Sequence, residues 1–115
     1  MRIKDIETQN LSKDCNEALI LGVLLCGRKH GYQLVLEVED SSRGYFKFNH
    51  GTLYPILHKL EKEGLIDGSW IKEGSKRKRK MYALTSKGRK YITGRMVAWR
   101  RFFDHLFEIF GEVDK

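Results

Sequence analysis

The strongest hydrophobic pattern in the chain lies between Asn49 and Ile66. Four leucine and isoleucine positions recur there at intervals of three and four residues, and a helix gathers such positions into one buried stripe. Asn49 is suited to cap the start of a helix, and Gly64 is suited to the left-handed position that ends one. We therefore predict a helix from about Asn49 to about Glu63, with a buried stripe made of Leu53, Ile56, Leu57 and Leu60.

The opposite face of this helix is neither apolar nor an ordinary mixture of acids and bases. It carries Gly51, Pro55, His58 and Lys62, with Tyr54 and Lys59 on the flanks. Proline inside a helix removes one backbone hydrogen bond and crowds the carbonyl group four residues earlier. For Pro55 that residue is Gly51, near the first turn, where the loss is smallest. The composition of this face indicates contact with a partner.

A first helix is expected near the start of the chain. Ser12 or Asp14 can cap it, and Glu17 is placed to complete a capping box with Asp14. The nearly unbroken apolar run over residues 18–26 indicates burial on most sides. We expect this helix to end at Gly27.

A second, amphipathic helix is predicted from about His30 to a break at residues 41–44, which contain serine and glycine. The next four residues, 45–48, alternate like a brief strand. Further along, residues 69–72 and 80–84 have strand composition and are separated by a charged segment that contains glycine. These two runs predict a β-hairpin with a charged tip.

A long helix is predicted after the hairpin, with Thr85 or Ser86 as its cap. Its apolar positions follow one another at intervals of four and three residues, which is the spacing of a coiled-coil seam. The seam would be about 27 Å long at 1.5 Å per residue, which is long for so small a domain to cover with its own helices. The core of the same chain is one candidate cover, but the length favours a partner chain. We expect a homodimer interface made of Ile92, Met96, Trp99, Phe103, Leu106 and Phe110.

The net excess of positive charge in the chain comes from one segment. Residues 72–90 hold nine basic side chains and one acidic side chain, a local charge of +8, whereas the whole chain carries +7. The remaining residues therefore carry about −1 in total. An excess of this kind is typical of a protein that binds a polyanion.

Length and composition restrict the alternatives. With 115 residues, the chain is expected to form one domain with a modest core. No apolar run reaches the ~20 residues that cross a membrane, and the start of the chain is too polar for a signal peptide, so a cytoplasmic protein is expected. Cys15 and Cys26 are spaced like reduced thiols on one helix face, and the histidines form no cluster with them, so neither a metal ion nor a cofactor is expected. No pattern typical of an active site is present, and we expect no enzymatic activity.

The predicted order of elements is helix, helix, helix, hairpin, helix. In a helix-turn-helix the second helix of the pair enters the major groove of DNA, and a following hairpin, or wing, lies on the neighbouring phosphates. The pattern thus predicts an α+β, mainly α fold. We expect a winged helix-turn-helix over residues 1–84 and a dimerisation helix over residues 85–115, packed as one compact unit.

Four segments in this order resemble the PadR family of bacterial transcriptional regulators, and the resemblance covers roughly residues 19–90. They are His30–Leu34, Gly51–Leu57, Leu60–Ile66 and Tyr82–Gly88. The single helix after the hairpin resembles the short PadR subfamily. This resemblance implies a homodimer built through that helix and, as in some members, a pocket for flat aromatic compounds at the dimer centre. His50 and Met81 differ from the residues usual in the family, which bears on base preference and on packing, respectively.

These observations predict the residues of two sites. A DNA-contacting surface is expected at Tyr32, Asn49, His50, Gly51, Thr52, Tyr54, Pro55, His58, Lys59, Lys76, Arg77, Lys78, Arg79 and Lys80. Trp99 matches the place of a pocket tryptophan in the short subfamily, so the resemblance implies a candidate effector pocket at Ala18, Trp99 and Phe103. Plain dimer packing is the alternative for Trp99 and Phe103, and packing on the second helix is the alternative for Tyr54.

Together these features predict a sequence-specific transcriptional regulator that binds double-stranded DNA. We expect a homodimeric repressor of a near-palindromic operator, released by a small aromatic effector. A DNA-binding regulator without a ligand and a basic RNA-binding module are the alternatives. A membrane-surface module would need its basic residues along a helix rather than on a hairpin, and the deep, narrow major groove of duplex RNA does not admit a helix.

Overall fold

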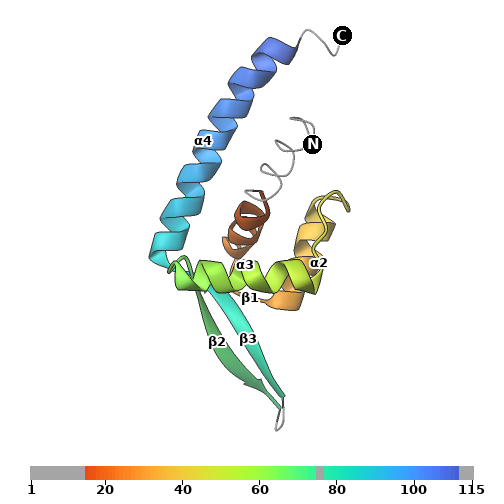
Figure 1. Ribbon diagram of the computed structural model, residues 1–115, viewed down its shortest axis with the longest axis vertical. Helices are drawn as coiled ribbons and strands as arrows, with labels where there is room; N and C mark the ends of the chain where they lie inside the picture. The colour runs from red at the N-terminus through yellow and green to blue at the C-terminus, as the bar shows by residue number, and fades with distance from the viewer. Residues whose placement is uncertain (1–14, 75–76, 112–115) are drawn as a thin grey trace, which may run out of the picture.

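The computed structural model of the protein describes residues 15–74 and 77–111. A helix over residues 15–24, which we call the N-terminal helix, is followed by β1 (Lys29–His30), α2 (Gly31–Ser41), α3 (His50–Lys62), β2 (Ile66–Glu73), β3 (Arg77–Leu84) and α4 (Ser86–Phe110). Figure 1 shows the N-terminal helix, α2 and α3 at the centre, with α4 and the β2–β3 hairpin projecting to opposite ends. The Cα radius of gyration is therefore 16.5 Å, against roughly 13 Å for a compact globule of this length.

The core lies where the three central helices meet the base of the hairpin. Leu53, Leu57 and Leu60 of α3 are buried and Ile56 packs against them, which confirms the predicted stripe. Burying a side chain of this size stabilises a fold by about 1.5–3 kcal/mol, so this stripe fixes the face that α3 presents outward. The core is made of Ile20, Leu21, Leu24, Leu34, Val38, Phe48, Leu53, Leu57, Leu60, Leu65, Ile66, Tyr82 and Ile92.

Local interactions define both ends of α3. The side chain of Asn49 accepts a hydrogen bond of 2.8 Å from the backbone amide of Thr52, which confirms Asn49 as the N-cap. At the other end Gly64 has a φ of +76°, a left-handed conformation that favours glycine. The amide of Leu65 then donates to the carbonyl of Leu60, which satisfies a carbonyl at the end of the helix.

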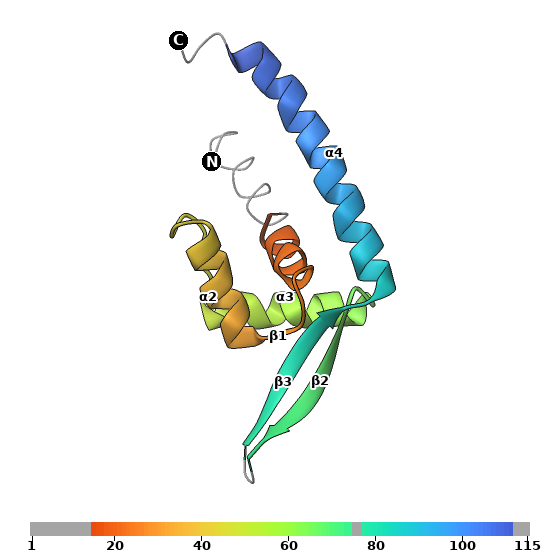
Figure 2. The same cartoon turned by 180° about the vertical axis from the view of Figure 1, so that it is seen from behind.

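The three strands form an antiparallel sheet in the order β1–β3–β2. We call the β2–β3 hairpin the wing; its strands pair from Ile66 opposite Leu84 to Glu73 opposite Arg77, over a longer stretch than the sequence predicted. β1 contributes two residues at the base of the wing, as the view from behind in Figure 2 shows. It was not predicted, because two residues are too few to show a period.

The prediction of a strand over residues 45–48 was wrong. These residues form a bend and an irregular stretch that leads into α3. Arg43 and Gly44 have positive φ values of 54° and 80°, and the hydroxyl of Ser42 accepts a hydrogen bond of 2.9 Å from the amide of Phe46. The chain therefore turns instead of extending, and the alternation reflects the burial of Phe48 in the core.

The N-terminal helix ends at residue 24, three residues before Gly27. The amides of residues 25–27 donate to carbonyls three positions earlier, which closes the helix in a tight turn. Its predicted caps, Ser12 and Asp14, lie outside the described residues. None of the helices in the described part of the chain combines the length and the apolar character needed to cross a membrane.

The start of α4 is bound to the end of α3. Thr85 caps α4, because its hydroxyl accepts from the amide of Gly88 at 2.9 Å and donates to the carbonyl of Gly64 at 2.7 Å. The amide of Thr85 also donates to the carbonyl of Leu65 at 3.1 Å. We call these contacts, together with a hydrogen bond from Lys87 to the carbonyl of Glu63, the α3–α4 joint.

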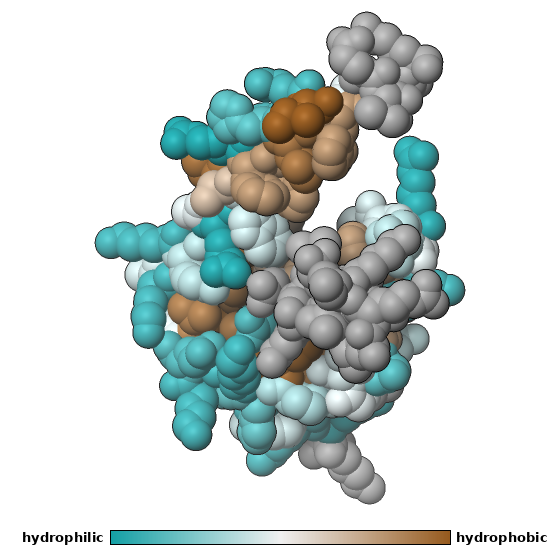
Figure 3. Space-filling model, turned by 45° about the horizontal axis from the view of Figure 1, so that its top comes forward, coloured by the Kyte–Doolittle hydropathy of each residue, from teal (hydrophilic) through white to brown (hydrophobic). Residues whose placement is uncertain are grey.

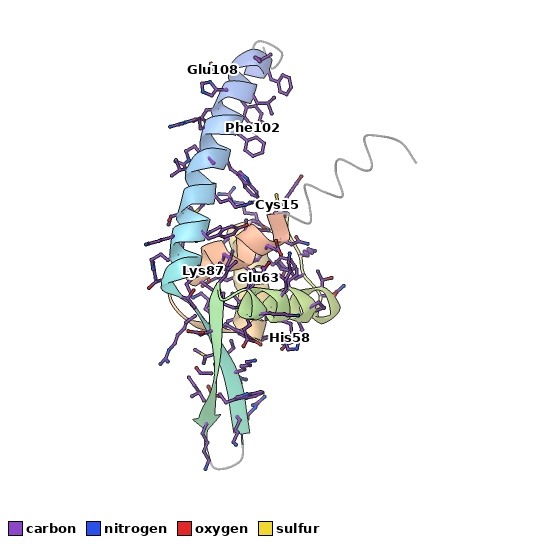
Figure 4. All side chains as sticks on the ribbon, turned by 60° about the vertical axis from the view of Figure 1, so that its left-hand side comes forward. Cys15, His58, Glu63, Lys87, Phe102 and Glu108 are labelled. Atoms are coloured by element: carbon purple, nitrogen blue, oxygen red, sulfur yellow. The ribbon has the colours of Figure 1, made fainter. Side chains whose placement is uncertain are left out.

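The joint also contains a longer side chain. The ammonium group of Lys87 donates to the carbonyl of Glu63 at 2.8 Å, and Figure 4 shows the two labelled residues side by side where α4 begins. Within α4 only Gly88 and Ile92 are buried. The helix is therefore attached to the rest of the chain chiefly through its first two turns.

Candidate nucleic-acid interface

Three elements bring many of the predicted DNA-contacting residues to one side of the molecule. The start of α2 contributes Tyr32, α3 contributes Tyr54, and β3 contributes the basic residues 77–80. Together with Trp70 of β2 they line a cavity of about 660 Å³ between the wing and the helices. A neighbouring hollow of about 520 Å³ extends along α3 and is lined by Tyr54, Pro55, His58, Lys80 and Tyr82.

Tyr54 packs on the start of α2. Its hydroxyl oxygen lies 3.2 Å from the point where a β-carbon on residue 31 would sit, so the approach depends on Gly31. The tyrosine is nevertheless 48 % exposed and lines both hollows. Tyr54 therefore packs on the second helix, as one of its two interpretations expected, and about half of its side chain is still accessible for the other, a contact with DNA.

The outward face of α3 is open to close approach. Gly51, Thr52, Pro55 and His58 are exposed, and the first turn contains no acidic residue. The start of a helix carries a partial positive charge, which favours an anionic partner at this end. His50 is the first residue of α3, but its side chain lies outside the described part of the structure, and Lys76 lies outside the described residues altogether.

Lys59 faces the N-terminal helix instead of the wing. Its ammonium group donates to the carboxylate of Glu17, and this hydrogen bond is the main cause of the raised pKa of Lys59. Glu17, expected in a capping box, is thus the partner of a residue on α3. Lys59 would have to leave Glu17 to reach a phosphate, which makes it the weakest of the predicted contacts on this helix.

The basic residues of the wing fall into two groups. Arg77 and Lys78 are exposed near the tip. Arg79 pairs with Glu73 of β2 at 3.5 Å, and Lys80 pairs with Glu61 of α3 at 2.9 Å. The hydrogen bond from Lys80 to Glu61 is also the main cause of the raised pKa of Lys80. Arg77 and Lys78 are therefore the better placed of these four cations to meet a phosphate.

A broad apolar face runs along the free part of α4. Phe102, Phe107 and Ile109 lie beside the predicted seam and are 59–75 % exposed; Figure 3 shows apolar side chains at this end of the molecule, and Figure 4 labels Phe102 there. Ile92, in contrast, is 1 % exposed and belongs to the core of its own chain, which corrects its assignment to the dimer seam. The other predicted seam residues, all at least partly exposed, are Met96, Trp99, Phe103, Leu106 and Phe110.

An apolar cavity of about 530 Å³ lies between the N-terminal helix and α4. Ala18 and Trp99, two of the three residues of the candidate effector pocket, line it together. Phe103 is not among the lining residues and stacks on Phe107, with 6.3 Å between ring centroids. The guanidinium group of Arg95 lies 5.4 Å from the centroid of the Trp99 ring, within the range of a cation–π contact.

Cysteine and histidine residues do not form a metal site in this part of the chain. Cys15 and Cys26 are both reduced, and both line the apolar cavity. Over residues 15–74 and 77–111, no three His, Cys, Asp or Glu side chains are grouped so that they could hold a metal ion.

Comparison with known proteins decides the family. The pattern described as the transcriptional regulator PadR-like family matches residues 20–94, from the N-terminal helix through α2, α3 and the wing into α4. The chain belongs to the PadR family. PadR proteins are DNA-binding regulators of transcription and not enzymes.

Individual PadR proteins share both sequence and fold with this chain. The negative transcriptional regulator PadR of Bacillus subtilis (strain 168) is 34 % identical over 73 residues, which are 64 % of this chain and 40 % of that protein. The structure of B. subtilis PadR in complex with operator DNA matches with a TM-score of 0.67 and 29 % identity, over 72 % of this chain and 46 % of that chain. A PadR family regulator from Eggerthella lenta DSM 2243 matches with a TM-score of 0.75 and 26 % identity, over 94 % and 92 % of the two chains.

The chain thus spans less than half of B. subtilis PadR but nearly all of the E. lenta regulator. The match to the E. lenta regulator confirms the resemblance to short PadR proteins. It also confirms the winged helix-turn-helix with a long last helix.

Sequence reasoning missed two residues of this candidate interface. Trp70 is 66 % exposed and lines the larger hollow, and Glu61 holds Lys80. Glu61 follows Tyr54 by seven residues and therefore lies on the same flank of α3, a signal that the helical period contains. Trp70 lies opposite Lys80 in the sheet, which could have been predicted only if the register of the hairpin were known.

Proposed function

We propose that this chain is a homodimeric repressor that binds a near-palindromic operator in double-stranded DNA. In each protomer α3 lies in the major groove and the tip of the wing lies on neighbouring phosphates. The observation that carries the proposal is the convergence of the open, acid-free start of α3 and the exposed wing cations on one side of the molecule. B. subtilis PadR, named a negative regulator and solved with operator DNA, supports it. A DNA-bound role also implies the cytoplasm as its location.

The two elements make different kinds of contact. Thr52 and Tyr54 present hydroxyl groups from the exposed face of α3, and a hydroxyl group can both donate to and accept from base edges. Arg77 and Lys78 present charges that neutralise phosphates, which adds affinity but carries no base information. Specificity is therefore assigned to α3 and salt-dependent affinity to the wing.

Binding measurements on an operator recovered from genomic DNA that the protein retains test this division. Arg77→Ala and Lys78→Ala are expected to weaken binding to operator and random duplexes alike, and each lost phosphate contact should flatten the plot of log K against log salt by ~0.9. Lys90→Ala is the control for charge, because Lys90 is an exposed cation of α4 that is not among the residues lining either hollow.

The matching test for α3 uses His50→Ala, Thr52→Ala and Tyr54→Ala. A contact to a base edge is worth ~1–3 kcal/mol, so at least one of these variants should narrow the gap between operator and random DNA. Unchanged discrimination in all three, with circular dichroism showing an intact fold, would assign the reading of bases to another element. Equal competition by duplex RNA would favour the RNA-binding alternative.

The homodimer is proposed on the apolar face of α4. At 100° per residue this face covers about half of the helix surface, which is wider than one two-helix seam requires. Large apolar side chains stabilise an interface by about 1.5–3 kcal/mol each when they become buried, and monomeric proteins rarely expose so many on one element. A two-fold axis beside α4 would cover them and set the distance between the two α3 helices. Sedimentation velocity measures the oligomeric state directly.

A small aromatic effector is proposed for the cavity between the N-terminal helix and α4. Its volume of about 530 Å³ suits a small molecule, and Trp99 offers a ring for stacking. Such a ligand releases DNA only if it binds the DNA-incompetent arrangement more tightly than the other. In a Trp70→Phe background, where Trp99 is the remaining indole, planar phenols and cations should quench the fluorescence, and no response to any of them would count against an effector here.

A further inference from the structure

Lys80 occupies the middle of the wing, and its surroundings differ from those of the tip cations. It lies opposite Trp70, three residue pairs before the last pair of the hairpin. Its ammonium nitrogen donates to Oε1 of Glu61 on α3 at 2.9 Å. The same nitrogen lies 5.4 Å from the ring centroid of Tyr82 and 6.0 Å from that of Trp70. One cation therefore connects both strands of the wing to α3.

Gly68 leaves the space that this arrangement needs. A β-carbon on residue 68 would overlap the side chain of Lys80 at Cε and would lie 3.2 Å from both Cδ and Oε1 of Glu61. The backbone of Gly68 does not have a positive φ, so the absence of a side chain, and not an unusual conformation, is what matters at this position. An alanine here would push Lys80 away from Glu61 without changing any charge.

We propose that Lys80 is a positioning residue: with Glu61 it forms a brace that holds the wing at a fixed angle to α3. The inference rests on the proposed function, in which α3 and the wing tip bind the same DNA at once. It also gives Lys80 a role that differs from the phosphate contact expected from the sequence. We call the contact between Lys80 and Glu61 the wing brace.

The length of the wing explains why a brace is needed. Without it, the last buried side chain of the wing is Tyr82, opposite Gly68 and five residue pairs before the end of the hairpin. At ~3.4 Å per residue the arm beyond Tyr82 is about 17 Å long, and a tilt of about 10° would move its end by about 3 Å. A displacement of that size is as long as a hydrogen bond, so a tip that tilts freely cannot stay on a phosphate while α3 stays in register with the bases. Besides the brace, the arm meets β1, where His30 pairs with Met81 and its ring nitrogen lies 3.4 Å from the carboxylate of Glu73, but neither contact reaches α3.

The brace and a phosphate contact predict opposite results for Glu61→Met. If Lys80 only contacts phosphate, removing its acidic partner frees the cation, strengthens DNA binding and steepens the salt dependence. If Lys80 positions the wing, Glu61→Met, Gly68→Ala and Lys80→Met should each narrow the preference for operator over random DNA by roughly tenfold. The double variant with Glu61→Met and Lys80→Met should be no worse than either single variant, because both remove one interaction.

Lys78→Met is the matched control, because it removes a cation two residues away on the same strand. It should flatten the slope of log K against log salt by ~0.9 and leave the preference for operator unchanged. Lys80→Met should instead leave that slope unchanged and narrow the preference for operator. Hydrogen exchange in the absence of DNA gives an independent readout of the wing. Amides of residues 70–73 and 77–80 should exchange faster in the three brace variants and at the normal rate in Lys78→Met.

Two outcomes would overturn the brace. One is a Glu61→Met variant that binds the operator more tightly with a steeper salt dependence; the other is unchanged exchange of the wing amides in all three brace variants. If the unmodified protein shows no preference for any DNA, the proposed function fails instead, and hydrogen exchange still decides whether the brace exists.

Discussion

The approach of α4 to the end of α3 predicts a large effect for one added methyl group. A β-carbon on residue 88 would lie 2.8 Å from the carbonyl carbon of Leu65 and 3.2 Å from its Cα, and closer still to the carbonyl oxygen. Carbon atoms in contact are normally about 3.5–4.0 Å apart. Because the obstacle is backbone, Gly88→Ala must separate α4 from the turn after α3.

The cost of that separation can be worked out from the α3–α4 joint. Two of its hydrogen bonds, from the amide of Thr85 to Leu65 at 3.1 Å and from its hydroxyl to Gly64 at 2.7 Å, would lengthen or break. Each contributes about 0.5–1.5 kcal/mol, and overpacking adds about 1–3 kcal/mol. Alanine regains about 1 kcal/mol because it favours the helix more than glycine does. We expect a net loss of roughly 1–5 kcal/mol in the free energy of unfolding.

Gly94→Ala is the matched control for this prediction. Gly94 lies in the same helix, and a β-carbon on it meets nothing within 4 Å. The substitution should raise the free energy of unfolding by about 0.5–1 kcal/mol. Urea unfolding followed by circular dichroism, at one fixed protein concentration because a dimer is stabilised by mass action, compares the two variants. Equal midpoints for Gly88→Ala and Gly94→Ala would refute the reasoning.

Three further substitutions test other parts of the structure. Asn49→Ala should lower the free energy of unfolding by about 1 kcal/mol, whereas Asn49→Ser should keep most of the cap, and the same urea assay measures both. Thr85→Val removes the hydroxyl group that caps α4 and bonds to α3, and it should cost about 1–2 kcal/mol in that assay, with Ser86→Ala nearly neutral. Phe103→Asp places a charge on the apolar face of α4 and should give monomers in sedimentation velocity. Arg101 lies on the opposite side of the same helix, so the control variant Arg101→Asp should remain a dimer. If the Phe103→Asp protein is also a dimer, this face of α4 is not the interface.

Local signals explain why α3 could be predicted almost to the residue. Asn49 acts on an amide three residues away, and Gly64 adopts a conformation that few other residues tolerate. The leucine stripe has a period that only a helix satisfies. The same reasoning identified Thr85 and Ser86 as candidate caps of α4. In the structure the cap is Thr85, whose hydroxyl accepts from the amide of Gly88 and also donates to the carbonyl of Gly64.

Contacts between distant parts of the chain could not be predicted in this way. Glu17 meets Lys59 across 42 residues and Glu61 meets Lys80 across 19, and no periodicity links such partners. The period of α4 likewise shows which residues share a face but not what covers it. Ile92 has the spacing of the seam and yet lies in the core of its own chain, because it is only seven residues from the cap.

The confinement of the buried part of α4 to Gly88 and Ile92 has a consequence for how such regulators diversify. Beyond these two positions the helix behaves as an exchangeable part. In the proposed homodimer, substitutions there would alter which chains pair with one another and which molecules the adjoining cavity accepts, while the proposed DNA-binding surface would keep its shape. A graft that joins the last five turns of another short regulator after Ile92 would therefore transfer a new partner or a new chemical signal onto an unchanged choice of operator.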